Sequence, residues 1–105
     1  MPLPDETQVI DAIRPVIDPE LGLSIVDLGL VYGVTISPEG AVTVRFTATT
    51  AGCPIVEVIA HGIFQSVRRL PGVTAVTPEL VWDPRWTPEK ITPEGLRHLQ
   101  ARKEH

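Results

Sequence analysis

Hydrophobic side chains recur at helical spacing near the start of the chain and continue into an apolar loop. The helical positions are Val9, Ile10, Ile13 and Ile17. Asp5, followed three residues later by Gln8, predicts a capping box at the first turn. Pro15 should end this helix near Arg14, because proline disfavours helical geometry in the residue before it. Residues 18–27, DPELGLSIVD, are too apolar for a solvated linker, so we expect them to pack against the domain.

Two segments in which apolar and polar side chains alternate follow the loop. In the first, Leu30, Tyr32, Val34 and Ile36 share one face, opposite Val31, Gly33, Thr35 and Ser37. In the second, Val42, Val44, Phe46 and Ala48 oppose Thr43, Arg45, Thr47 and Thr49. A period of two residues is typical of β-strands. The turn sequence SPEG at residues 37–40 joins the two segments and predicts a β-hairpin.

The second half of the chain predicts a long helix, a third strand and a short terminal helix. Pro54 suits the first helical turn, and Gly72 is placed to end the helix. Its apolar stripe consists of Ile55, Val58, Ile59, Ile63, Val67 and Leu70. Residues 73–82 predict the third strand, in which Pro78 indicates an edge position or a bulge. Thr92, followed by Pro-Glu, is typical of a helix cap.

The predicted order of elements is therefore α-β-β-α-β-α. We expect an α+β fold, a single compact two-layer domain with a mixed sheet of about three strands and helices mainly on one face. The 105 residues, 43% of them hydrophobic, suit one domain spanning residues 1–105. Residues 86–105 form its proline-punctuated C-terminal tail.

Charge and composition exclude several classes of protein. The net charge is −4 and Arg68-Arg69 is the longest basic run, which argues against nucleic-acid binding. No apolar run approaches the ~20 residues that span a bilayer. The N-terminal residues lack the features of a signal peptide, and a single cysteine cannot form an internal disulfide. We expect a cytoplasmic protein.

The single cysteine, Cys53, lies in the sequence TTAGCP, where the second strand ends and the long helix begins. Unpaired N–H groups and the helix dipole at that point favour a thiolate over a thiol. The hydroxyls of Thr49 and Thr50 could donate to the sulfur. The other interpretation is a small apolar side chain packed under the helix, since free cysteines are usually buried. The residues alone leave both open.

The loop carboxylates Asp18, Glu20 and Asp27 also allow two interpretations. They could hold a metal, orient a partner of the thiol or dock a protein; alternatively, they could bond the loop's own backbone. A Cys–His dyad is improbable, because His61 lies eight residues along the helix from Cys53, ~12 Å of helical rise. No complete catalytic constellation is visible, so we assign no catalytic residue.

Three separated motifs resemble the MIP18 family, also called the DUF59 domain. They are DPELGLSIVDLGLVYGV from Asp18 to Val34, TTAGCP from Thr49 to Pro54 and LVWDPRWTPEKIT from Leu80 to Thr92. The resemblance implies a compact domain related to iron–sulfur assembly folds and, among bacterial members, SufT-type accessory factors. It further implies that Asp18, Glu20 and Asp27 line a site with Thr49, Thr50 and Cys53.

The main hypothesis is thus a non-enzymatic accessory factor in iron–sulfur cluster assembly or delivery, with Cys53 as a transient ligand or contact. A cluster takes about four thiolate-type ligands and this chain offers one. We therefore expect no tightly bound cofactor in the monomer, and any cluster to be bridged between subunits or partners. Expected partners are iron–sulfur assembly proteins, client apoproteins and a second copy in a homodimer, but no nucleic acid or membrane. Alternatives are an assembly accessory for an oxygenase of the phenylacetyl-CoA type, a thiol-dependent enzyme with Cys53 as nucleophile, and a purely structural adaptor.

Overall fold

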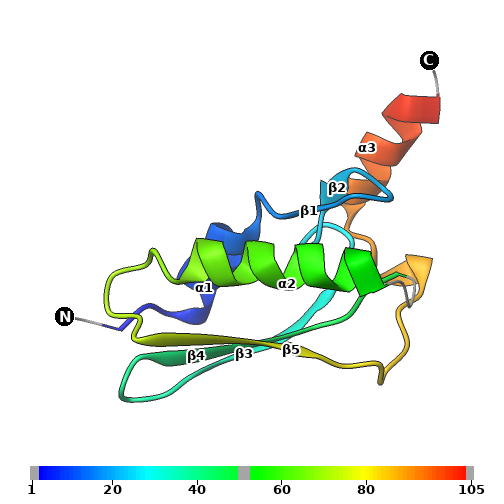
Figure 1. Ribbon diagram of the computed structural model, residues 1–105. Helices are drawn as coiled ribbons and strands as arrows, with labels where there is room; N and C mark the ends of the chain where they lie inside the picture. The colour runs from blue at the N-terminus through cyan, green and yellow to red at the C-terminus, as the bar shows by residue number, and fades with distance from the viewer. Residues whose placement is uncertain (1–2, 50–52, 104–105) are drawn as a thin grey trace.

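The computed structural model describes residues 3–49 and 53–103, with the backbone alone described for Cys53 and for residues 100–103. A three-stranded sheet forms one layer and two helices cover one of its faces (Figure 1). These elements are α1 (Glu6–Ile13), β3 (Val31–Ile36), β4 (Ala41–Phe46), α2 (Cys53–Val67) and β5 (Ala75–Leu80). The predicted α+β class, with a mixed three-stranded sheet, is confirmed.

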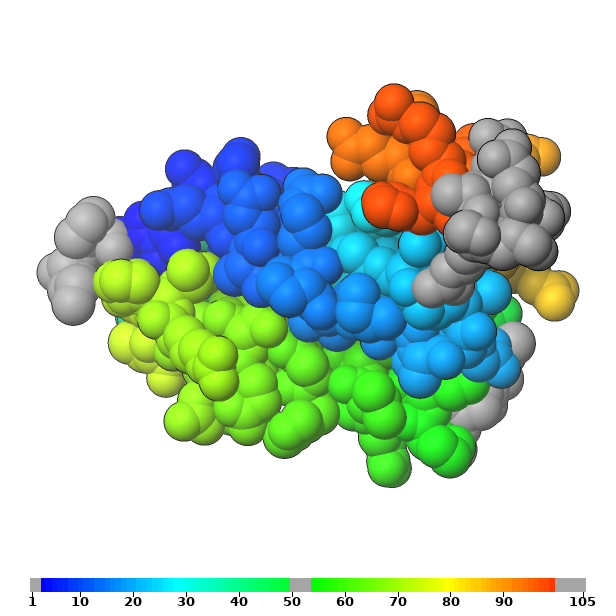
Figure 2. All heavy atoms as spheres, turned by 90° about the horizontal axis from the view of Figure 1, so that it is seen from above, coloured from blue at the N-terminus to red at the C-terminus, as the bar shows by residue number. Residues whose placement is uncertain are grey.

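Four further elements complete the described chain. They are β1 (Ile17–Asp18), β2 (Leu23–Ser24), the 3-10 helix η1 (Pro88–Lys90) and α3 (Pro93–Lys103). The antiparallel pair β1–β2 lies in the segment that the sequence predicts to be only a packed loop. Seen from above the helices, α1 and the loop after it lie beside α2, and α3 stands at the far end of that loop (Figure 2).

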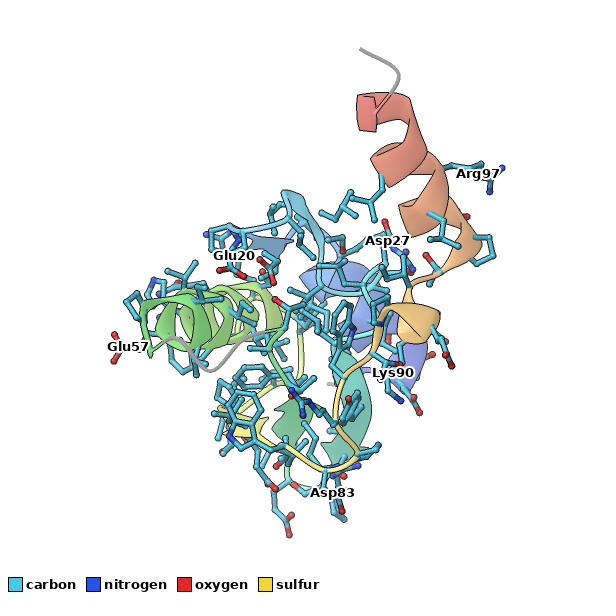
Figure 3. The ribbon with its side chains drawn as sticks, turned by 90° about the vertical axis from the view of Figure 1, so that its right-hand side faces the viewer. Glu20, Asp27, Glu57, Asp83, Lys90 and Arg97 are labelled. Carbon is cyan, nitrogen blue, oxygen red and sulfur yellow. The ribbon has the colours of Figure 1, made fainter. Side chains whose placement is uncertain are left out.

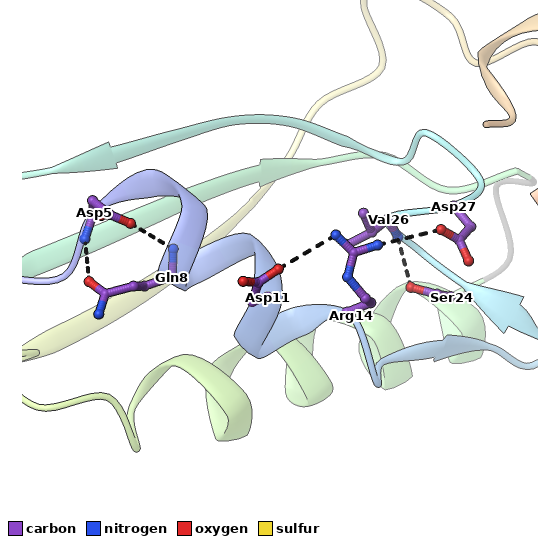
Figure 4. Close-up of polar contacts among 7 residues, drawn as sticks. All are labelled: Asp5, Gln8, Asp11, Arg14, Ser24, Val26 and Asp27. Atoms are coloured by element: carbon purple, nitrogen blue, oxygen red, sulfur yellow. Dashed lines mark hydrogen bonds and ion pairs between the residues drawn. The ribbon is translucent and has the colours of Figure 1, made fainter. Parts of the chain in front are cut away.

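Local chemistry explains where α1 begins and ends. The Asp5 side chain accepts the Gln8 N–H at 2.8 Å, and the Asp5 N–H donates to the Gln8 side chain at 2.9 Å (Figure 4). This is the predicted capping box. The helix ends at Ile13, two residues before Pro15, and it buries Val9 and Ile13 completely.

The hairpin has the predicted turn but contains a bulge that the alternation does not reveal. β3 and β4 are antiparallel, and their register shifts between Val31 and Gly33. Val31 is paired with the core residue Phe46, so it lies on the helix-covered face with Val34 and Ile36. The prediction that put Val31 on the opposite face is therefore wrong, because the extra residue at the bulge, Tyr32, reverses the alternation.

Strand β5 runs parallel to β4 and lies at the edge of the sheet, whose order is β3-β4-β5. Pro78 lies within β5, opposite Val44. The Val81 N–H donates to the Phe46 carbonyl at 2.9 Å. Because the direction of backbone groups alternates along a strand, this bond leaves the nitrogen of Pro78 on the outer edge, where no donor is needed. The predicted edge position is confirmed.

The core lies between the helices and the sheet. Its fully buried members from α2 are Ile59, Ile63 and Val67, together with Val42, Val44 and Phe46 from β4 and Ile25, Leu28 and Leu30 from the loop. Burial of the loop residues confirms that the apolar segment packs against the domain. Val58, predicted within the apolar stripe of α2, is instead 51% exposed. Val58 lies outside the face of α2 that packs on the sheet, which is narrower than the predicted apolar stripe.

The C-terminal segment folds back onto the loop before β3. The Thr92 hydroxyl caps α3 by accepting the Gly95 N–H at 3.1 Å, as predicted, and the Thr92 N–H donates to the Asp27 carbonyl at 2.8 Å. The indole of Trp86 donates to the Leu28 carbonyl at 2.6 Å. Within the described ranges, no helix is both long enough and apolar enough to cross a membrane.

Candidate functional site

Asp18 is the buried centre of the loop between β1 and β2. Its side chain is completely buried, and its Oδ1 accepts the N–H groups of Glu20 at 2.8 Å and Leu21 at 3.3 Å. The Asp18 carbonyl accepts the Gly22 N–H at 2.7 Å. An aspartate that bonds the backbone just after it is well suited to a tight turn. One carboxylate therefore sets the course of the loop and the position of Glu20.

Thr49, three residues after the end of β4, brings the segment between β4 and α2 to this loop. Its hydroxyl lies 3.4 Å from Oδ2 of Asp18 and 3.5 Å from Oε2 of Glu20. A hydroxyl has one proton, so it can donate fully to only one carboxylate at a time. Figure 3 shows Glu20 above α2, near the end at which the helix begins. Three of the predicted residues thus meet where β4 leads into α2.

Asp27 makes its contacts elsewhere. Its Oδ1 lies 3.7 Å from Nη1 of Arg14, whose Nη2 lies 3.6 Å from Asp11 (Figure 4). Its carbonyl receives the N–H of Thr92. Asp27 therefore links α1 to the C-terminal segment, and it is not among the groups that contact Thr49.

The start of α2 has a favourable electrostatic setting for a negative group. Cys53 is the first residue of the helix, and the first turn contains no acidic side chain. The first N–H groups of a helix have no partner within the helix and carry partial positive charge. Thr50 and the side chain of Cys53 lie outside the described residues. Among the side chains that are described, no group of three or more His, Cys, Asp or Glu could hold a metal ion.

Two contacts near the loop had no signal in the sequence. Arg14 and Trp86 both reach the segment before β3, one from α1 and the other from a position 58 residues further along the chain than Leu28. Neither residue belongs to a local spacing pattern with its partner. Only the fold brings these pairs together.

The phenol of Tyr32, in β3, has a pKa that its surroundings raise. Burial, and then the negative charge of Asp83, raise the pKa of its phenol above the ordinary value. The hydroxyl is buried and has no hydrogen-bond partner among the described residues. The ammonium of Lys90 lies 5.2 Å from the centre of the ring, so this tyrosine supports the packing of η1 against β3.

A family model described as an iron–sulfur cluster assembly protein matches residues 6–77, well over half of the chain. The chain belongs to this family. The matched range includes the β1–β2 loop, Thr49 and the start of α2, which are the elements that meet at the candidate site. The C-terminal segment with Trp86 and α3 lies beyond it.

Two relatives that the chain covers over most of their length support the assignment to this family. The Fe-S protein maturation auxiliary factor YitW of Bacillus subtilis is 37% identical over 84 residues, which cover 80% of this chain and 82% of YitW. The Fe-S protein maturation auxiliary factor SufT of Staphylococcus aureus is 40% identical over 77 residues, covering 73% and 88% of the two chains.

A solved DUF59 domain from Bacillus anthracis has the same fold, with a TM-score of 0.76 and 33% sequence identity, covering 90% of this chain and 91% of the other. The resemblance to the MIP18 or DUF59 family that three sequence motifs carry is confirmed. The relatives described here are named as maturation factors and not as enzymes.

Proposed function

We propose that this chain is a non-enzymatic accessory factor that assembles iron–sulfur clusters or delivers them to client proteins, with Cys53 as a transient ligand. One observation carries the proposal: the buried Asp18 fixes a loop that sets Glu20 and the Thr49 hydroxyl close to the helix end where Cys53 begins. YitW and SufT, both named as Fe-S protein maturation auxiliary factors, support the same role.

Each group has a distinct part in this mechanism. In this role the first N–H groups of α2, which have no partner within the helix, stabilise the negative charge of the Cys53 thiolate and of a cluster that the thiolate ligates. In the proposed role Thr50 supplies a hydroxyl donor to that sulfur, and Thr49 does so only when its single proton turns away from the carboxylates of Asp18 and Glu20. Asp18 positions Thr49. Glu20 presents an exposed carboxylate on the surface beside the start of α2. Asp27, at the end of the loop away from Thr49, holds the loop against α1 through its ion pair with Arg14.

The number of thiolates determines how a cluster could be held. A cluster takes about four thiolate-type ligands, and the chain has one cysteine. The cluster is the cargo of this protein and must be shared with a partner, a second subunit or a small thiol. Shared ligation is weak enough to be reversed, which suits transfer to a client apoprotein. The partners proposed are therefore iron–sulfur assembly proteins and their clients.

A thiol-dependent enzyme is the less favoured function, because the described residues that meet at the site, Asp18, Glu20 and Thr49, include no histidine. His61 is exposed and lies two turns further along α2. The groups beside Thr49 are carboxylates, whereas histidine is the side chain that most often serves as a general base. The proposed role needs neither a base nor a bound substrate.

Anaerobic reconstitution with iron and sulfide tests the role of Cys53. Wild type, Cys53→Ser and Thr49→Val are compared by visible absorption and by iron content. Thr43→Val is the matched control, because it makes the same change within β4, away from the loop. We expect substoichiometric iron in wild type and Thr43→Val, less in Thr49→Val and background levels in Cys53→Ser.

The outcomes separate the functions. Iron retained by Cys53→Ser, or absent from every variant, contradicts the carrier mechanism. In cells lacking the chain's own gene, recovery of a cluster-dependent enzyme by Cys53→Ser would then identify an adaptor. If Cys53→Ser does not restore that enzyme and no variant binds iron, the thiol acts on another substrate.

A further inference from the structure

Large apolar side chains are exposed on three elements around the candidate site. Ile17 in β1 is 45% exposed, Val58 in α2 is 51% exposed, and Trp82, just after β5, is 48% exposed. Single exposed apolar side chains are common on protein surfaces, whereas a group of them around one site is typical of an interaction surface. The fold decides whether these three form such a group.

Ile17 lies next to the carboxylates of the site. It directly precedes the buried Asp18, whose side chain contacts Thr49. Asp18 points inward and Ile17 outward, because successive side chains of a strand alternate. Ile17 therefore presents its apolar side chain at the surface beside the β1–β2 loop.

Val58 lies on the side of α2 along which β1 runs. Gly62, one turn further along the helix, faces Val16, because an added Cβ on Gly62 would lie 2.8 Å from a Val16 methyl. Residues four positions apart share one side of a helix, and β1 packs against α2. The exposed side chain of Val58 is five residues after Cys53, or ~8 Å of helical rise.

Trp82 lies at the end of the sheet from which the chain enters α2. β4 and β5 are parallel and paired as far as Phe46 and Leu80, and the Val81 N–H donates to the Phe46 carbonyl at 2.9 Å. Beyond this point β4 continues to Thr49 and the start of α2, while β5 continues to Trp82. α2 itself packs between β1 and β5 (Figure 1), so the three exposed side chains flank the start of α2 on both sides.

We propose that Ile17, Val58 and Trp82 form the surface on which a client apoprotein docks to take the cluster; this inference rests on the proposed delivery role. Delivery requires an exchange of ligands, in which a client thiolate bonds to iron, the bond between iron and Cys53 breaks, and no electron is transferred. The client thiol releases its proton to solvent, and the Cys53 sulfur leaves as a thiolate. The client's cysteines must therefore reach the cluster at Cys53, so the client covers the surface around the start of α2.

The chemistry of this docking surface defines the contact face of the client. That face presents apolar side chains next to its cluster-binding cysteines, because an exposed indole and two branched side chains gain most from leaving water against apolar atoms. Tryptophan is among the residues that most often dominate the binding energy of an interface. Trp82 is therefore the anchor of the contact.

Transfer to a tagged apo-ferredoxin with four cluster-binding cysteines tests the docking surface. The full chain is loaded anaerobically with iron and sulfide in the presence of glutathione, and its iron content is measured. The ferredoxin is added at a series of concentrations, separated through its tag at timed intervals, and assayed for its cluster by visible absorption. Wild type is compared with Trp82→Ala and Phe64→Ala, after circular dichroism has verified that both variants fold. Phe64 is the matched control, because its aromatic side chain is 37% exposed on α2 but lies eleven residues, or ~16 Å of helical rise, from Cys53.

We expect equal iron loading of the three proteins. The half-saturating ferredoxin concentration should rise about tenfold or more in Trp82→Ala and change by no more than about twofold in Phe64→Ala. The maximal rate should be unchanged, because the exchange of ligands does not use the indole.

The outcomes separate this inference from the delivery role. Equal transfer by loaded wild type and Trp82→Ala, or equal effects of the two variants, overturns the docking surface and leaves the delivery role intact. Lower iron loading of Trp82→Ala also overturns it, because the indole would then support the cluster and not the client. If loaded wild type transfers no cluster, the delivery role fails and this inference fails with it.

Val58→Gln tests the same surface in case Trp82→Ala fails to fold. Glutamine is a good helix former, and the side chain that it replaces is half exposed. The half-saturating ferredoxin concentration should rise about threefold or more with unchanged iron loading. A value equal to that of wild type contradicts docking at this surface.

Discussion

Replacing Asp18 by alanine should destabilise the fold substantially, because one side chain holds the β1–β2 loop. Its carboxylate accepts one short hydrogen bond of 2.8 Å from Glu20 and two longer ones, of 3.3 Å from Leu21 and 3.4 Å from Thr49. Hydrogen bonds to charged groups contribute about 1.5–3 kcal/mol each when well formed. Counting the long bonds at less than the lower value, and allowing for relief of a buried charge, the net loss is about 2–4 kcal/mol.

Thermal and urea unfolding followed by circular dichroism measure this loss. For a domain of about 100 residues, each 1 kcal/mol lowers Tm by about 4–8 °C, so Asp18→Ala should lower it by roughly 8–30 °C. Asp18→Asn keeps one carbonyl oxygen for the loop N–H groups. It should cost about half as much, on the order of 1–2 kcal/mol.

Asp11→Ala is the matched control for Asp18→Ala. The Asp11 side chain is 64% exposed, and its ion pair with Arg14 spans 3.6 Å, so its removal should cost less than about 1 kcal/mol. If Asp18→Ala were no more destabilising than Asp11→Ala, the loop would have to be held by its apolar residues, and the reasoning that makes Asp18 its centre would be wrong.

Two further predictions concern the region where the C-terminal segment meets the sheet. Burial and Asp83 raise the pKa of Tyr32 above its ordinary value of about 10, so the unfolded chain ionises first as pH rises. The free energy of unfolding should therefore fall from about pH 10 up to the raised pKa in wild type, and less steeply in Tyr32→Phe. Equal slopes in a urea series across that range would contradict this. Gly29→Ala should destabilise by about 2 kcal/mol or more, because Gly29 has φ of 73° and its new Cβ would collide with the Lys90 carbonyl. The comparison is Gly62→Ala in α2, where φ is not positive and the nearest contact of the new Cβ is a Val16 methyl at 2.8 Å and not a backbone carbonyl. A Gly29→Ala melt no lower than that of Gly62→Ala would refute the close approach.

The candidate site was predictable only in its chemistry. The cysteine at a strand-to-helix junction and the carboxylates in an apolar loop stand out in the sequence because such residues are unusual in those settings. Their arrangement did not follow from spacing. Thr49 reaches Asp18 across 31 positions of the chain, whereas Asp27, only nine residues after Asp18, turns to Arg14 instead. The joint role of all six residues stays a prediction.

The sequence by itself determined the features that depend on neighbouring residues. Asp5 and Gln8 cap α1, Gly40 closes the hairpin turn with φ of 90°, and Pro78 marks an edge strand. Each follows from backbone geometry or from hydrogen bonds over a few positions. The alternation and helical stripes likewise placed the main strands and helices.

Only the tertiary structure decided which of these local possibilities is used. The bulge at Tyr32 moves Val31 to the core face, and Val58 is left exposed because the sheet covers a narrower part of α2 than its apolar pattern spans. The loop from Asp18 folds into a paired ribbon that packs against α2 and α3, and Trp86 bonds the Leu28 carbonyl just after it. Such outcomes depend on contacts between residues far apart in the chain, whose energies have no counterpart in a local pattern.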